Sequence, residues 1–461
     1  MFWKSRDEQS DASPFLVSGS EIYSFSDVFK IGDDFFKNKN ISNSVCLIAC
    51  DRNVHTVAAY LGCLRQGIVP ILVDAGLSVD LINDIANQYQ VETILHSGLL
   101  ESDTYSNDGT FGLFNIYRSK NPTDILLNDQ LTLVLPTSGS TGDPKCVRLN
   151  SVNIDSCTKE IVRYLNLDKD RISISSLPFH YTYGLSVLHG VLETRSKMVL
   201  TDLSLIDKQF WSLVEQNQVT DLSGVPFMFE VLRRIKLTPT ILTNLKCVTQ
   251  AGGRLDTKYT EHFVKFFCEN DISYFTMYGQ TEASPRISYV PPESALAKLG
   301  SVGIALDIGR FYTDAVDSVS EGELIYEGPN VCMGYAYSRE DLSKPDSNKG
   351  ILKTGDIATI DNEGFATIVG RKKRFVKVYG SSVNLDDLES KLKAKSFDTA
   401  VIGRDEKIIV LTADDDSAGI KSYLYSFVNF PTRAIKIIKI DEIKYSGVGK
   451  PDYLLMAKEY S

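Results

Sequence analysis

The sequence has no apolar run long enough to span a bilayer, and only five of its 461 residues are histidine. A membrane-spanning helix needs about 20 apolar residues, so such a helix is excluded. The first residues, Met1-Phe-Trp-Lys-Ser-Arg-Asp-Glu8, lack the apolar core of a signal peptide. The dispersed histidines, and the lack of a CxxC pair or a Cys/His zinc spacing, argue against a zinc site. We therefore expect a cytoplasmic protein without a membrane span.

Basic residues are outnumbered by acidic ones, which gives a net charge of -10. This balance argues against nucleic acid as a partner, because nucleic acid attracts basic surfaces. The composition, 43% hydrophobic and 23% charged, is that of a globular protein. Its length predicts a large core and more than one domain. Eight scattered cysteines, mostly in apolar surroundings, are expected to be buried, reduced thiols.

Apolar segments alternate between the patterns of strands and helices. Strands are expected at 44–50, 68–73, 91–95, 131–135, 172–177, 245–250 and 272–277, helices at 54–64 and around 81–86, and a strand followed by a turn at 222–229. Gly67 can end the first helix. This alternation predicts a doubly wound α/β sheet.

One stretch, Leu135-Pro-Thr-Ser-Gly-Ser-Thr-Gly-Asp-Pro-Lys145, combines glycines, hydroxyl groups and a cation after a buried strand. Glycines let backbone N–H groups face an anion, and the hydroxyls and the lysine add further donors. The stretch differs from the common P-loop because Asp143-Pro144 separates Gly142 from Lys145. By composition alone an ordinary turn is the more frequent alternative to a polyphosphate site.

The whole string Thr137–Lys145 closely resembles the phosphate loop of the adenylate-forming superfamily, which includes acyl-CoA synthetases, aryl-CoA ligases, luciferases and peptide-synthetase adenylation domains. Cys146 departs from the glycine that is usual there. The resemblance implies that the phosphates of ATP are bound by Thr137, Ser138, Gly139, Ser140, Thr141, Gly142 and Lys145.

Further motifs of this family follow in the family's order. Tyr278-Gly-Gln-Thr-Glu282 implies that Tyr278 and Gly279 bind adenine, that Thr281 reaches the α-phosphate and that Glu282 ligates Mg²⁺, both of the last two as catalytic residues. Before it, Ala251-Gly252-Gly253 follows a strand, where glycines allow a flat ring to approach. Later, Asp356 in Lys353-Thr-Gly-Asp and Arg371 in Gly370-Arg match the residues that bind ribose.

The segment Pro178-Phe-His-Tyr-Thr-Tyr-Gly-Leu185 is expected to be an aromatic turn, and it resembles the lining of the family's acyl pocket. The implied pocket residues are His180, Tyr181, Tyr183 and Gly184. The family often has a gating histidine where this chain has Tyr181, so either His180 or Tyr181 could be the gate. No acidic residue is close in the sequence to pair an ammonium, and a buried unpaired ammonium is costly. We therefore expect an uncharged acyl or aryl acid as substrate.

The resemblance also implies a mobile C-terminal domain. Lys373 in Arg371-Lys-Lys-Arg374 occupies the hinge position, residues 376–380 form the loop that would reach the thiol tunnel, and Lys450 is the catalytic lysine. We expect a large α/β domain over residues 1–371 and a small α+β domain over 372–461. Within the second we expect helices at 385–393 and 420–427 and strands at 399–402, 408–412 and 435–440.

The implied activity is ATP-dependent, AMP-forming activation of a small carboxylic acid to an acyl-adenylate, with Mg²⁺, followed by transfer to a thiol. We expect coenzyme A as the thiol. One alternative is the phosphopantetheine of a separate carrier protein. A second alternative, a nucleotide-binding relative without catalysis, is disfavoured by the presence of Glu282, Asp356, Arg371 and Lys450.

Overall fold

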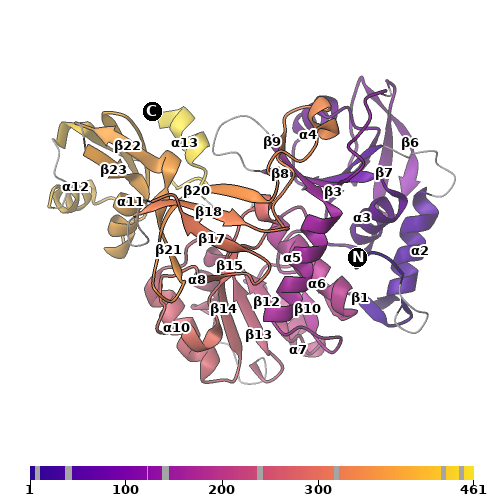
Figure 1. Cartoon of the computed structure of the whole chain (residues 1–461), viewed down its shortest axis with the longest axis horizontal. Helices are drawn as coiled ribbons and strands as arrows, with labels where there is room; N and C mark the ends of the chain where they lie inside the picture. Colours follow the sequence, from indigo (N-terminus) through magenta and orange to yellow (C-terminus); the bar gives the residue numbers. More distant parts are fainter. Residues whose placement is uncertain are drawn as a thin grey trace. The chain divides into compact units, whose positions relative to one another are not determined.

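The computed structural model describes residues 1–5, 11–36, 44–121, 123–137, 145–235, 242–315, 321–379, 381–426, 432–445 and 451–460. They divide into two compact units (Figure 1). The first comprises the described parts of residues 1–137, 145–310 and 327–352, and the second those of 311–326 and 353–461. The boundary that we predict after Arg371 lies inside the second unit and stays a prediction.

Among the residues that the structure describes, one sheet of the first unit has eight strands. In spatial order they are β19 (Tyr335–Ala336), β9 (Lys145–Asn150), β8 (Leu131–Thr137), β4 (Val69–Asp74), β3 (Val45–Cys50), β5 (Thr93–His96), β7 (Phe114–Ser119) and β6 (Tyr105–Phe111). The central strands β8, β4, β3 and β5 are parallel. Along β3 successive side chains enter two different core clusters, so both faces of the sheet are covered, as is typical of parallel strands.

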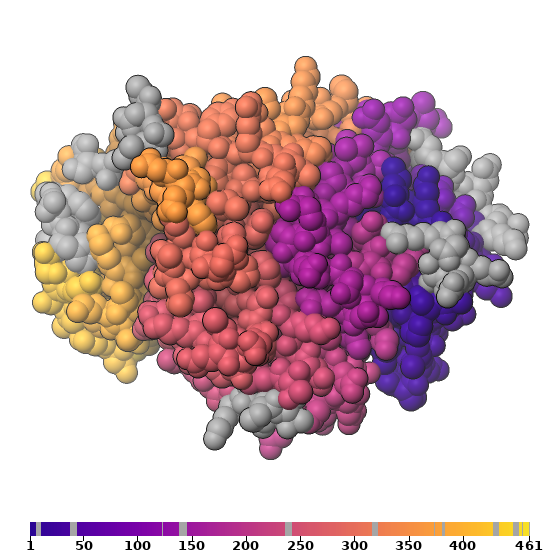
Figure 2. Space-filling model, turned by 60° about the horizontal axis from the view of Figure 1, so that its bottom comes forward, coloured from indigo at the N-terminus to yellow at the C-terminus, as the bar shows by residue number. Residues whose placement is uncertain are grey.

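The second sheet of this unit has nine strands. In spatial order they are β16 (Ile304–Ala305), β15 (Ser288–Tyr289), β14 (Ser273–Tyr278), β13 (Cys247–Gln250), β12 (Asp221–Gly224), β10 (Ile172–Ile174), β11 (Lys197–Leu200), β1 (Pro14–Ser18) and β2 (Glu21–Ser24). The N-terminal strand β1 is parallel to β11, although some 180 residues separate them in sequence. In Figure 2 the indigo N-terminal part of the chain lies beside magenta parts of the first unit.

The helices of the first unit are α2 (Phe25–Phe36), α3 (Val54–Gln66), α4 (Val79–Gln88), α5 (Ser151–Tyr164), α6 (Thr182–Thr194), α7 (Lys208–Gln216), α8 (Pro226–Leu232) and α10 (Thr257–Cys268), with short 3₁₀ turns η1 (Thr281–Ala283), η2 (Pro292–Ser294) and η3 (Glu340–Ser343). Helix α3 begins after Asn53, whose side chain accepts a hydrogen bond from the Thr56 amide, and ends at Gly67 in the left-handed conformation. The predicted helix and its glycine cap are confirmed.

A core cluster joins the two sheets through helices that lie between them. It contains Ile48 of the first sheet, Met198 of the second and Leu188 of α6, all buried. All eight cysteines are free, and all except Cys268 are buried, which confirms the expected thiols. Cys146 is buried in the core on β9, so the glycine usual there is replaced by a residue that packs.

The described part of the second unit contains three smaller sheets and three helices. They are the sheet β17 (Arg310–Thr313), β18 (Gly322–Glu327), β20 (Ile351–Ile360) and β21 (Ala366–Arg371); the hairpin β22 (Phe375–Val378) and β23 (Ser381–Asn384); the sheet β24 (Thr399–Arg404), β25 (Lys407–Thr412) and β26 (Ile435–Lys439); and α11 (Leu385–Ala394), α12 (Ser417–Tyr425) and α13 (Tyr453–Tyr460), with η4 (Lys372–Arg374) and η5 (Thr432–Ala434). The predicted strands and helices after residue 384 are confirmed within a few residues.

Three local predictions are wrong. The aromatic segment is a turn only as far as Tyr181, because α6 begins at Thr182. The segment 222–229 continues from β12 into α8 instead of ending in a turn, and Pro226 stands in the first turn of that helix. Residues 376–378 are no loop: they belong to β22, which pairs with β23.

Candidate functional site

The carboxyl ends of three parallel strands meet at one edge of the nine-stranded sheet. In their register Gly224 of β12 lies beside Gln250 of β13, which lies beside Thr276 of β14. The residues that follow these strands are therefore neighbours, among them the predicted Gly252 and Gly279. Ligands of α/β proteins bind at such an edge.

Gly252 has a φ of +86°, and a Cβ there would lie 2.4 Å from the hydroxyl of Tyr181. The glycine therefore permits both the backbone conformation and the close approach of the tyrosine. Gly253 follows, and its carbonyl accepts a hydrogen bond of 2.9 Å from the Gln250 side chain. The aromatic segment and the two glycines, which the sequence indicated as separate motifs, are thus neighbours in the fold.

His180 and Tyr181 have different neighbours. Tyr181 packs on Gly252, and burial raises its pKa to about 12. His180 lies with its Nε2 3.8 Å from Oδ2 of Asp74. Burial lowers the pKa of His180, while Asp74 opposes this shift. Asp74 is distant in sequence, so the premise that no acid lies near this segment is wrong in space.

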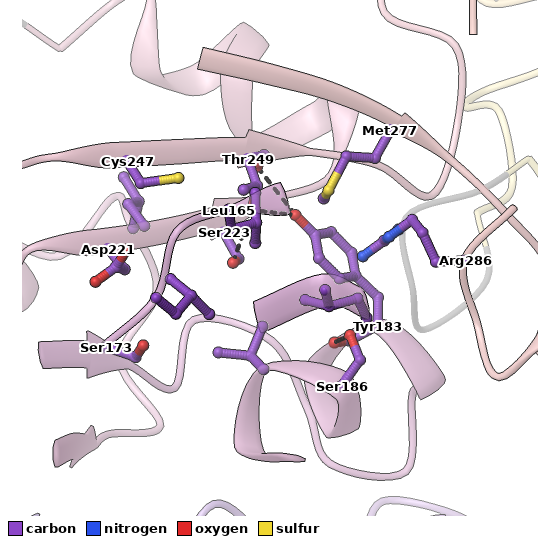
Figure 3. A pocket seen from close by; sticks show the side chains of 14 residues that line it. Leu165, Ser173, Tyr183, Ser186, Asp221, Ser223, Cys247, Thr249, Met277 and Arg286 are labelled. Carbon is purple, nitrogen blue, oxygen red and sulfur yellow. Dashed lines mark hydrogen bonds between the residues drawn. The ribbon is translucent and has the colours of Figure 1, made fainter. Parts of the chain in front are cut away.

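Tyr183 and Gly184 lie in the first turn of α6, with the ring of Tyr183 directed toward β13. Its hydroxyl donates to the carbonyl of Thr249 at 3.0 Å and lies 2.7 Å from the Thr249 hydroxyl (Figure 3). A Cβ on Gly184 would lie 2.3 Å from the carbonyl oxygen of Pro178, so the turn packs tightly against the helix. Tyr183 is thereby fixed in the core rather than at the surface.

Glu282 and Lys145 are brought together by Tyr335, a residue without a predicted role. The hydroxyl of Tyr335 donates to Oε1 of Glu282 at 2.7 Å, and the ammonium of Lys145 lies 3.6 Å from the centre of the Tyr335 ring. Burial and, to a smaller extent, the neighbouring Glu282 raise the pKa of Tyr335. Its hydroxyl therefore stays protonated and donates the hydrogen bond to Glu282. The motif Met333-Gly-Tyr335 was the signal that could have identified this tyrosine.

Short strands and turns hold these groups in place. Lys145 begins β9 opposite Thr137 at the end of β8, and the Thr137 hydroxyl donates to the Lys145 carbonyl at 3.4 Å. β19, which carries Tyr335, pairs with β9. Thr281 and Glu282 lie in η1, which follows Gly279 and Gln280 after Tyr278, the last residue of β14. The strand–loop–strand arrangement around the phosphate loop differs from that of a P-loop, as predicted.

Several predicted residues lie outside the described part of the chain. These are Ser138, Gly139, Ser140, Thr141 and Gly142 of the phosphate loop, Gly380 of the segment after the hinge, and Lys450. The same holds for the side chain of Lys373, whose backbone belongs to η4.

In the second unit Asp356 and Arg371 lie opposite each other on β20 and β21. Arg371 Nε is 3.4 Å from Oδ1 of Asp356, whose side chain is almost fully buried, while Arg371 is half exposed. Asp356 lies within β20 rather than after a strand, next to a shift of register between Ile357 and Ala358. The TGD and GR motifs therefore form one acid–base pair on adjacent strands.

The predicted hinge position lies between two ion pairs of the second unit. On one side Lys372 contacts Glu323 of β18 at 2.7 Å. On the other side Arg374 contacts Asp386 of α11 at 2.6 Å, and its guanidinium lies 3.8 Å from the ring centre of Tyr453. One neighbour of Lys373 is thus attached to the four-stranded sheet and the other to the helices that follow.

A small cavity of about 30 Å³ lies in the first unit, below the edge that carries Gly252 and Tyr278. Its walls come from α5, α6 and the strands β10, β12, β13 and β14, and Figure 3 shows the side chains that line it. Two buried charged residues, Asp221 and Arg286, are part of this lining, and sequence reasoning missed both. Burial raises the pKa of Asp221 to about 6, and Arg171 opposes the shift.

The model of one protein family, described as AMP-binding enzyme, matches residues 36–336. The chain belongs to the AMP-binding enzyme family. Acid–thiol ligases are among the relatives that the chain resembles.

A 2-succinylbenzoate–CoA ligase of Bacillus pumilus is 26% identical over 346 residues, covering 70% of this chain and 68% of that protein. A D-alanine–D-alanyl carrier protein ligase of Bacillus cytotoxicus is 24% identical over 365 residues, covering 74% and 71%. Both relatives are named as ligases of the kind that the sequence motifs predict.

Solved structures confirm the predicted fold class. MatB of Rhodopseudomonas palustris, with ATP bound, has a TM-score of 0.80 at 19% identity, over 100% of this chain and 97% of that one. The o-succinylbenzoate CoA synthetase MenE of Bacillus subtilis, with its acyl-adenylate OSB-AMP, has a TM-score of 0.77 at 19% identity, over 96% and 95%. Among the described residues of this AMP-binding enzyme, no helix is both long and apolar enough to cross a membrane.

Proposed function

We propose that this enzyme uses Mg²⁺ and ATP to convert a small carboxylic acid to an acyl-adenylate, and then transfers the acyl group to a thiol, with coenzyme A as the acceptor. The observation that carries the proposal is the grouping of Lys145 and Glu282 around Tyr335. The ring of Tyr335 contacts Lys145, a cation suited to phosphate, and its hydroxyl contacts Glu282, a carboxylate suited to a metal ion. Glu282 follows β14, near the kind of sheet edge at which α/β proteins bind ligands.

The residues present suit Mg²⁺ carried by a nucleotide. Mg²⁺ is usually bound by one or two carboxylates together with phosphate oxygens. Oε1 of Glu282 accepts the hydrogen bond of the Tyr335 hydroxyl, and no described residue donates a hydrogen bond to Oε2. The described ranges contain no cluster of three or more potential metal ligands, so the metal would enter with the phosphates. Bound there, it would neutralise phosphate charge.

The chain's own groups supply positioning and charge rather than a covalent nucleophile. The acid is an anion that must approach a polyanionic nucleotide, so the barrier is largely electrostatic. Lys145, with the hydroxyls and amides of the loop at 137–142, would hold the phosphates, and Thr281 would orient the α-phosphate. Lys450 would bridge the acid and the α-phosphate.

We further propose that Asp356 accepts the ribose hydroxyls with Arg371 beside it, and that residues 372–461 rotate about Lys373 between the two half-reactions. The ion pair of Lys372 with Glu323 and that of Arg374 with Asp386 support a pivot at this position, because they attach its two neighbours to different elements. Rotation would withdraw Lys450 after adenylation.

The acceptor and the location complete the proposal. The relatives include a CoA ligase and carrier-protein ligases, so a carrier-bound phosphopantetheine is the alternative acceptor. Free, buried cysteines suit the cytoplasm, where thiols stay reduced. Tyr183 of the aromatic segment lines the cavity together with the buried charges of Asp221 and Arg286. The surroundings of the aromatic segment therefore do not require the substrate to be uncharged.

Pyrophosphate exchange into ATP across a panel of acids tests the first half-reaction, and AMP release with coenzyme A or with candidate carrier proteins tests the second. Activity with coenzyme A alone would support the proposal. Exchange followed by transfer only to a carrier would favour the alternative. Nucleotide binding without exchange on any acid would contradict catalysis.

A further inference from the structure

Arg286 is the most unusual charged residue of the first unit. It lies just beyond η1, its side chain is 2% exposed, and it lines the cavity below the strand edge. Its Nε donates to the hydroxyl of Tyr164 at 3.1 Å, and its guanidinium carbon lies 5.0 Å from the ring centre of Tyr183. A guanidinium has five N–H donors, so one hydrogen bond leaves most of them without an acceptor among the described residues.

Other buried arginines of the same unit are compensated. Arg339 pairs with Glu92 at 2.8 Å, Arg195 pairs with Asp11 at 3.1 Å, and Arg148 donates to three backbone carbonyls. No described carboxylate lies within ion-pair distance of Arg286. Burying a charge without a partner is costly, and proteins rarely retain it without a ligand or a function.

Asp221, the one carboxylate among the described residues that line the cavity, does not neutralise Arg286. Asp221 is ion-paired with Arg171 at 2.9 Å, and its second oxygen accepts the hydroxyl of Thr220. In Figure 3 Asp221 and Arg286 stand at opposite sides of the lining, with Tyr183 between them. The uncompensated charge of the cavity is therefore positive.

Size restricts the group that could supply the missing charge. A water molecule requires about 10–15 Å³ of such space, so a cavity of about 30 Å³ admits about two waters or one small group such as a carboxylate. The lining follows β13 from its first residue, Cys247, to Thr249, one residue before the strand ends at Gln250. At about 3.3 Å per residue the cavity therefore extends from near the sheet edge to about 10 Å below it.

We propose that Arg286 binds a second carboxylate at the far end of the acid, so that the substrate of this enzyme is a dicarboxylic acid. This proposal rests on the proposed function, in which the first carboxylate reacts at the level of Thr281. The acid extends from there along the strands, past Tyr181, and its distal carboxylate receives the free N–H groups of Arg286. A bidentate, buried contact of this kind selects strongly for the charged group.

The test compares dicarboxylic acids of increasing length with their monoamides, using pyrophosphate exchange. At the best length we expect kcat/KM for the diacid to exceed that for the monoamide by about a hundredfold or more. Arg286→Met should abolish this preference by lowering kcat/KM for the diacid far more than kcat/KM for the monoamide. Arg286→Lys should restore part of the preference. Equal activity of the wild type on both acids, or equal losses in Arg286→Met, would overturn the proposal.

Stability separates a ligand-binding arginine from a structural one. Removing an uncompensated buried charge should raise the Tm of the ligand-free Arg286→Met protein, whereas Arg339→Met, which breaks a satisfied ion pair, should lower it and leave the preference unchanged. A lower Tm in Arg286→Met with an unchanged preference would make Arg286 structural.

If no acid supports exchange, the proposed function fails, and the binding site is still tested directly. The diacid should raise the Tm of the wild type and not that of Arg286→Met, and the monoamide should raise neither. An equal shift with both compounds would refute the inference irrespective of catalysis.

Discussion

Replacing Tyr335 by phenylalanine should weaken the apparent affinity for Mg²⁺ without changing the use of the acid. The substitution removes the hydroxyl that donates to Glu282 at 2.7 Å and keeps the ring on which Lys145 lies. A hydrogen bond to a charged group contributes about 1.5–3 kcal/mol. Both side chains are only partly buried, so we take the lower value, about 1.5 kcal/mol, which corresponds to about a tenfold change.

The measurement is the initial rate of pyrophosphate release against Mg²⁺ concentration, at saturating ATP and acid. We expect the Mg²⁺ concentration for half-maximal rate to rise about tenfold in Tyr335→Phe, within the range seen when residues that orient a metal ligand are changed. Tyr335→Leu should lose a further few-fold, because it also removes the cation–π contact with Lys145.

Tyr183→Phe is the matched control, since it removes a tyrosine hydroxyl of the same unit that contacts Thr249 instead of Glu282. It should leave the Mg²⁺ dependence unchanged. The reasoning would be refuted if Tyr335→Phe kept the wild-type Mg²⁺ dependence, or if its defect appeared in the KM of the acid alone.

Three further predictions concern other sites. Glu282→Gln should impair use of Mg²⁺-ATP, while Asp356→Ala should weaken binding of AMP as well as ATP; wild-type exchange rates and AMP affinity in both variants would contradict the site. Lys450→Ala should slow adenylation by roughly a hundred- to thousand-fold and largely spare thioester formation from supplied acyl-adenylate, whereas equal losses in both assays would deny the rotation. Burial lowers the pKa of His189 to about 3 from 6.5, so its contribution to stability is present above pH 6.5 and is lost as the pH falls toward 3. Urea unfolding should therefore show a loss of about 2 kcal/mol from this group between pH 7 and pH 5, and His189→Gln should lack that part of the loss.

Local signals account for what the sequence predicted well. Strand β3 and helix α3 were readable because their apolar periods are clear and Gly67 ends the helix. The beginning of α6 was missed for an equally local reason: its N-cap is Tyr181, whose side chain makes no capping hydrogen bond, so the usual polar start signal is absent. Aromatic residues in a row were therefore interpreted as a turn.

The site residues that were missed depend on contacts between distant segments. Tyr335 and Glu282 are 53 positions apart, and the approach of His180 to Asp74 crosses from one sheet to the other. Arg286 follows a turn and a proline, in a stretch that resembles an exposed loop. Only the packing of α5, α6 and the strands makes that arginine a buried cation, and no periodicity in the sequence reports such packing.

Because the net charge of the protein is -10, the binding of anions depends strongly on these few local cations. A nucleotide and a diacid are both anions, so the overall field of the protein opposes their approach, and affinity must come from local groups. Salt screens exposed charges over about 10 Å at 0.1 M, but a guanidinium that is 2% exposed is screened much less. Discrimination at Arg286 should therefore be less sensitive to ionic strength than the encounter with the substrate, because recognition at Arg286 takes place in the buried cavity and the encounter takes place in solution.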